Sequence, residues 1–97
     1  MTDEEKRSLE LLEANHSFPG DFPLIVIALN SDEVTAAVVQ AAQEGLAAPL
    51  PPDAHETRLS SGGKYISHRL RVPCAASADV IRLYARVRAV SGVVSVL

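Results

Sequence analysis

SSGGKYISHRLRV, residues 60–72, predicts a tight turn followed by a well-patterned β-strand. Gly62 and Gly63 give a hairpin signal, because glycine adopts positive φ without steric cost and the pair separates two strand-like runs. The side chains after the turn then alternate between two faces: Ile66, His68, Leu70 and Val72 on one, and Tyr65, Ser67, Arg69 and Arg71 on the other. A period of two indicates a strand with one face on a core, and Pro73, which lacks a backbone N–H, is expected to end it.

The remaining elements are predicted on both sides of this hairpin. Residues 22–29 are apolar on both faces and favour a central strand. Asn30 or Ser31 caps the helix that follows, and Ser77 caps a second one. Strands are expected near 22–30, 54–60, 64–73 and 92–97, and helices near 31–44 and 77–90.

This order predicts an α+β, ferredoxin-like βαββαβ sandwich, with a four-stranded antiparallel sheet and two helices on one face. Residues 18–97 form the single domain, and residues 1–17 form an N-terminal arm that is flexible or a short helix, because Thr2 and Glu5 have capping-box spacing. The predicted core consists of Val26, Val38, Ile66, Leu70, Leu83 and Val87.

The composition of the chain restricts the functional classes and the cellular location that we expect. The net charge of −3 argues against nucleic acid, which requires a basic footprint. Cys74 is the only cysteine, so no internal disulfide can form and a reducing compartment is expected. The acidic N-terminus has no apolar run after it, and no stretch reaches the ~18 apolar residues of a membrane span. The sequence therefore predicts a cytoplasmic protein with no membrane association.

The open sheet face is predicted to mediate self-association. Two rows of branched apolar side chains, bordered by a polar third row, form a patch that monomers rarely expose, so a homodimer is expected. The residues of this predicted face are Ile25, Ile27, Val94, Val96, Tyr65, Arg69 and Arg71. In the rival interpretation, the N-terminal arm folds over the patch with Leu9, Leu12 and Phe18.

No catalytic, metal or cofactor site can be placed. The turn Ser60-Ser61-Gly62-Gly63-Lys64-Tyr65 is a candidate ligand or partner site that could cradle a phosphate, but it lacks P-loop spacing and favours a structural turn. The histidines His16, His55 and His68 show no ligand spacing with each other or with Cys74. A cysteine beside a proline at a strand end is more often a small buried hydrophobe than a nucleophile.

Several short motifs resemble the YbeD-like family, small bacterial proteins grouped as a domain of unknown function. The matching pieces are Asp21-Phe22-Pro23, Ser60-Ser61 with Gly63-Lys64-Tyr65 and Ser67, Leu83-Tyr84, and Val96-Leu97. The resemblance covers residues 18–97 and implies a four-stranded antiparallel sheet with two helices on one face, similar to the ACT domains that bind amino acids and regulate enzymes. It implies no established catalytic activity.

Two departures from the related patterns concern binding. ACT domains usually carry a glycine between the first strand and the first helix, whereas this chain has Asn30-Ser31-Asp32. Family members tend to be polar or basic at the positions of Ile25 and Val94, which are apolar here. We expect a small non-enzymatic regulatory or protein-interaction module, ACT-like, that senses a small metabolite or binds a metabolic enzyme. The alternative is an RNA-binding ferredoxin-like domain, for which the third strand offers only one aromatic, Tyr65.

Overall fold

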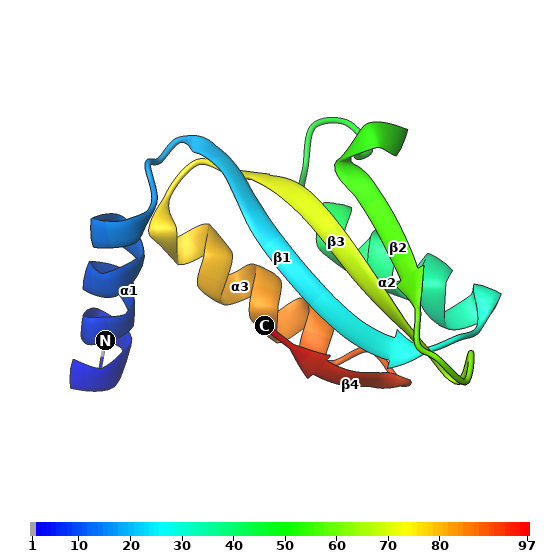
Figure 1. The fold of residues 1–97 in the computed structure, drawn as a ribbon. Coiled ribbons are helices and arrows are strands. Elements are labelled where there is room, and N and C mark those ends of the chain that lie inside the picture. Colours follow the sequence, from blue (N-terminus) through cyan, green and yellow to red (C-terminus); the bar gives the residue numbers. More distant parts are fainter. Residues whose placement is uncertain (1) are drawn as a thin grey trace.

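The computed structural model describes residues 2–97 and has an α+β architecture with a four-stranded antiparallel sheet (Figure 1). The elements in chain order are α1 (Asp3–Asn15), β1 (Gly20–Leu29), α2 (Asp32–Gln43), a 3₁₀ turn (Pro52–Ala54), β2 (His55–Leu59), β3 (Tyr65–Cys74), α3 (Ser77–Arg88) and β4 (Val93–Val96). Every predicted strand and helix is present, with ends that differ from prediction by two residues or fewer.

The strands lie in the order β2-β3-β1-β4, so the first and third strands are central as expected. In Figure 1, α2 and α3 lie behind the sheet while α1 stands beside its end. The β1 and β3 side chains that face the helices are almost fully buried, and those on the other face are more exposed. The sheet therefore has one face on the core and one open face.

The core lies between the sheet and the helices α2 and α3. Its apolar members come from β1, β3, α2 and α3: Phe22, Leu24, Val26, Val38, Ala41, Ala42, Leu70, Val72, Cys74, Val80, Leu83 and Val87. The predicted core residues are buried apart from Ile66, which is half-buried. Ile66 faces Ala28 and Leu59 at the hairpin end of the sheet, where Leu59 itself is exposed.

Several local details differ from the predictions. Ser31, not Asn30, caps α2 by accepting a hydrogen bond from the N–H of Val34. Ser77 does not cap α3, because it is the first residue of that helix. The backbone N–H groups of Ala75 and Ala76, which precede the helix, donate to the carboxylate of Asp79. Pro73 does not end β3, which continues to Cys74. Because β2 pairs with β3 only as far as Leu70, β3 has no neighbour on that side at Pro73, where a missing N–H is tolerated.

Candidate functional site

The open face of the sheet combines an apolar row on β1 with a cationic row on β3. Ile25 and Ile27 are half-buried and Leu29 is 40% exposed. In the β1–β3 register these residues lie opposite Arg69, Ser67 and Tyr65, and Arg71 follows opposite Pro23. Paired residues on neighbouring antiparallel strands share a face. The predicted side chains of β1 and β3 are therefore brought together as expected.

The prediction that Val96 of β4 lies on the open face is wrong. A bulge between Ile27 and Ala28 places an extra residue, Val94, in β4, and this shifts the alternation that follows. Val96 consequently lies opposite Val26 and packs against the core. Val94 is exposed at the bulge.

The same shift brings one unpredicted apolar residue onto the open face. Leu97 exchanges two backbone hydrogen bonds with Ile25 and is 60% exposed. Ser95 lies opposite Ile27. The open face therefore carries Ile25, Ile27, Leu29 and Leu97 as its apolar cluster.

The edge strand β2 adds charged side chains that sequence reasoning did not place. Glu56 lies opposite Arg69 and Arg58 lies opposite Ser67, so both share the open face. The face of each β2 side chain could not be predicted from the sequence, because β2 has no apolar alternation of its own and its register with β3 was not known. The guanidinium of Arg71 donates to the backbone carbonyl of Asp53, which ties the turn before β2 to this face.

Several backbone donors of the candidate turn at Ser60–Tyr65 form hydrogen bonds within the turn. The N–H of Gly63, which has φ +72°, donates to the carbonyl of Ser60, and the N–H of Tyr65 donates to the Ser60 hydroxyl. Asn30 donates from its side chain to the Gly63 carbonyl at 2.9 Å. The Lys64 ammonium lies 5.4 Å from the Tyr65 ring centre. These contacts describe a braced structural turn, and sequence reasoning did not foresee its link to Asn30.

Two of the three histidines form a pair inside the sheet. His55 Nε2 lies 2.9 Å from His68 Nδ1, and the rings stack. Burial lowers the pKa of both imidazoles, and the neighbouring His55 lowers the pKa of His68 further. Both rings are thereby kept neutral near pH 7. His16 lies elsewhere, against Phe22.

Cys74 is buried at the end of β3, as the sequence predicted. Burial raises the pKa of its thiol, the charge of Asp79 raises it further, and Arg86 partly offsets these effects. A thiol in this state is a poor nucleophile at neutral pH. Within residues 2–97, no three His, Cys, Asp or Glu side chains come together as metal ligands.

The N-terminal arm does not cover the open face. α1 packs against α3, and Leu12 and Phe18 contact the core from the helix side. The hydroxyl of Ser77, at the start of α3, donates to the Glu13 carboxylate at 2.8 Å. Figure 1 shows α1 beside the end of α3, away from β4 and β2. The rival interpretation of an arm folded over the patch is therefore wrong for this structure.

Comparison with known proteins identifies a family and no activity. None of the helices in residues 2–97 is long and apolar enough to cross a membrane. No curated protein matches the chain. The model of a family described as "Protein of unknown function (DUF493)" matches residues 13–97, from the last turn of α1 to the end of β4 and beyond. The chain therefore belongs to this family of proteins of unknown function, which includes the YbeD-like proteins that its motifs resemble.

Proposed function

We propose that the protein is a small non-enzymatic regulatory or protein-interaction module that works as a two-fold dimer through its open sheet face. The observation that carries the proposal is the apolar cluster of Ile25, Ile27, Leu29 and Leu97 on a sheet face with no helix over it. The strand order β2-β3-β1-β4 supports a ferredoxin-like, ACT-like arrangement, in which an open sheet face is available to a partner.

The distribution of charge on this face favours a second copy in one orientation. Arg58, Arg69 and Arg71 lie on β2 and β3 with a single carboxylate, Glu56, so that side of the face is cationic. Two cationic sides brought together would repel each other. A two-fold axis near β1 and β4 avoids this repulsion, because it places the apolar clusters in contact and leaves the arginines at the solvated rim.

The free energy of dimer formation would come from burying the apolar cluster. Burial contributes on the order of 25 cal/mol per Å² of apolar surface, before the cost of association. Leu29 and Leu97 are 40% and 60% exposed, so both have surface to lose in an interface. A dimer built on such a small cluster would be reversible, which suits a module whose partner is a metabolic enzyme and whose assembly state is regulated.

The chemistry of the titratable groups supports the non-enzymatic part of the proposal. The His55–His68 pair is turned toward the core, and the pKa of the Cys74 thiol is raised. Asp79 is occupied by two backbone N–H groups and by Arg82. None of these groups is an acid or base poised over a substrate cavity on the open face.

Sedimentation equilibrium of the full chain tests the dimer. We expect a monomer–dimer equilibrium at tens of micromolar, which Ile27→Lys abolishes because a charge would be buried at the centre of the interface. Ile81→Lys is the control: Ile81 is 40% exposed and lies on α3, away from the open face, so this variant should associate like the parent. A full chain that stays monomeric at these concentrations contradicts the proposal.

RNA binding is the second candidate. Arg58, Arg69 and Arg71 on the open face, next to Tyr65, are the observation that favours it. The face lacks the further aromatic side chains on which RNA-recognition sheets stack bases, so this candidate ranks below the dimer. Titration of the full chain with single-stranded RNA at low salt separates the two, because RNA binding would weaken steeply as salt rises.

A further inference from the structure

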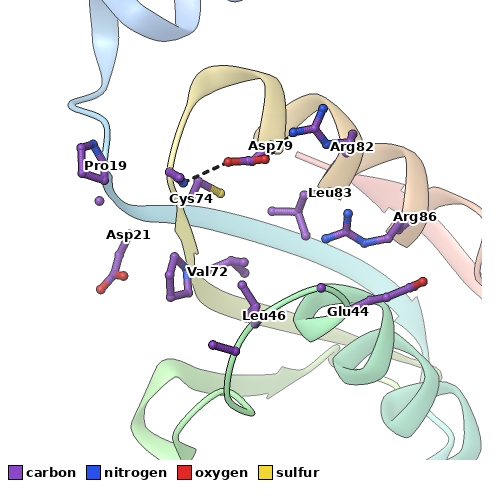
Figure 2. A pocket seen from close by; sticks show the side chains of 15 residues that line it. Pro19, Asp21, Glu44, Leu46, Val72, Cys74, Asp79, Arg82, Leu83 and Arg86 are labelled. Atoms are coloured by element: carbon purple, nitrogen blue, oxygen red, sulfur yellow. Dashed lines mark hydrogen bonds and ion pairs between the residues drawn. The ribbon is translucent and has the colours of Figure 1, made fainter.

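A pocket of about 550 Å³ opens on the helix side of the sheet, away from the apolar cluster of the open face (Figure 2). Its walls come from four segments that are distant in the sequence: the start of β1, the end of β3, one side of α3 from its first turn to its last, and the loop after α2. A volume between about 300 and 1,000 Å³ is typical of small-molecule sites.

Two arginines line this pocket, and Arg86 is the one that contacts α2. Its Nε donates to the backbone carbonyl of Ala41 at 3.0 Å, which holds the half-buried side chain across from the end of α2. No carboxylate among residues 2–97 lies within ion-pair distance of Arg86. In Figure 2 its guanidinium points toward the middle of the pocket. The Nη groups of a fixed arginine in this position match the two oxygens of a carboxylate.

The other charged residues of the pocket do not compete for Arg86. Asp79 is already bonded to Arg82 and to the backbone N–H groups of Ala75 and Ala76. Figure 2 shows the carboxylates of Asp21 and Glu44 pointing away from the pocket. The unpaired charge directed into the pocket is therefore that of Arg86, while the acidic groups around it, Asp79 included, oppose a ligand of high negative charge.

The rest of the pocket lining is mainly apolar, and it determines what kind of ligand body the pocket can bind. Val72, Leu46, Leu83 and Cys74 line the pocket, and Figure 2 shows Leu83 next to the guanidinium of Arg86. One cation on an apolar floor fits a molecule with one negative charge and a hydrocarbon portion. A phosphate dianion has no apolar portion to bury, and it would meet only one unpaired cation.

We propose that this pocket binds a small organic monocarboxylate, with its carboxylate on the Nη groups of Arg86 and its short apolar body against Val72, Leu46 and Leu83. Binding would connect the end of α2 to α3, because Arg86 joins both through the Ala41 carbonyl. This inference goes beyond the dimer, and it does not depend on it, because the pocket shares none of the apolar cluster of the open face.

Amide NMR titration of the full chain with acetate, butyrate and hexanoate tests the proposal. We expect hexanoate to shift the resonances of Leu46, Ala47 and Ala75, with affinity rising two- to fourfold for each added methylene, about the value of burying a CH₂ group. Arg86→Met should weaken hexanoate binding about tenfold or more, because a charge-assisted pair is lost. Arg88→Met, on the exposed side of the same helix, is the matched control and should bind like the parent.

Further probes distinguish the alternatives. Hexylamine has the same body with the opposite charge and should not bind, and inorganic phosphate should not displace hexanoate. If Arg86→Met fails to fold, Arg86→Lys keeps the charge without the planar fork and should bind hexanoate several-fold more weakly.

The proposal is overturned if hexanoate causes no shifts at tens of millimolar, if hexylamine or phosphate binds equally well, or if the folded Arg86 variant binds like the parent. The Ile27→Lys chain should bind hexanoate normally whatever its oligomeric state.

Discussion

At the scale of single residues, His68 is the polar side chain with the most distinctive environment. It is fully buried, and its Nε2 has no hydrogen-bond partner among residues 2–97. Its Nδ1 shares one proton with Nε2 of His55, so one imidazole donates and the other accepts. Each neutral imidazole carries one N–H, so a third proton on the pair would place a charge beside a neutral ring in the core, which burial opposes.

The first prediction concerns the pH dependence of stability. The pKa of both paired histidines is lowered in the folded chain, so the unfolded chain binds more protons below its pKa of about 6.5. The histidine contribution to the free energy of unfolding should therefore be complete well above about pH 6.5 and should decline as the pH falls below it. Urea unfolding across this range should show the decline, with a slope of at most about 1.4 kcal/mol per pH unit per proton.

His68→Phe removes one titrating ring of similar size and should reduce this slope. Leu70→Val is the control, because it weakens the same strand without a titrating group and should lower stability equally at each pH. A His68→Phe chain with the slope of the parent would show that the pair does not govern the pH dependence.

At the scale of elements, the connection from α3 to β4 depends on Gly92. Its φ of +97° lies in the region that favours glycine, and a Cβ there would lie 2.7 Å from a methyl carbon of Val34 on α2. The Gly92 carbonyl also accepts a hydrogen bond from the N–H of Leu29, at the end of β1. At Gly92, therefore, α2 and β1 both lie close to the start of β4.

The second prediction is that Gly92→Ala destabilises the fold. Backbone strain alone should cost roughly 1–3 kcal/mol, and the contact with Val34 adds to it. Combining it with Val34→Ala should cost less than the sum of the single changes, because the contact is relieved while the strain remains. Gly62→Ala is the control, since a Cβ there meets nothing within 4 Å, and it should change the urea midpoint little. Strict additivity would contradict the proposed contact.

At the scale of the whole molecule, the position of α1 sets which surface is available to partners. α1 is capped by Thr2, whose side chain accepts from the N–H of Glu5, and it docks on α3 rather than on the sheet. Leu12 contacts the core, whereas Leu11, the residue before it, is 58% exposed. The arm therefore leaves the open face free.

The third prediction separates these two leucines. Leu12→Ser should lower the free energy of unfolding by roughly 1–3 kcal/mol, and Leu11→Ser should leave it within about 0.5 kcal/mol of the parent. Because α1 does not cover the open face, sedimentation equilibrium should give Leu12→Ser the same association constant as the parent. Increased association of Leu12→Ser alone would show that the arm does restrict this face.

The strands, the helices and the two faces of the central strands were predictable from the sequence, because each depends on local chemistry. Gly62-Gly63 marks the turn, and the period of two along Tyr65–Val72 assigns its side chains to faces without knowledge of any neighbour. β1 is apolar on both faces and could be recognised as central for the same reason.

The features that the sequence did not reveal depend on contacts between distant segments. The β4 bulge follows from pairing with β1, and it exchanges Val96 for Leu97 on the open face. The His55–His68 contact follows from the β2–β3 register, and the site around Arg86 requires four segments to converge. No periodicity in one segment encodes these pairings, because they are set by how the packed elements share one core.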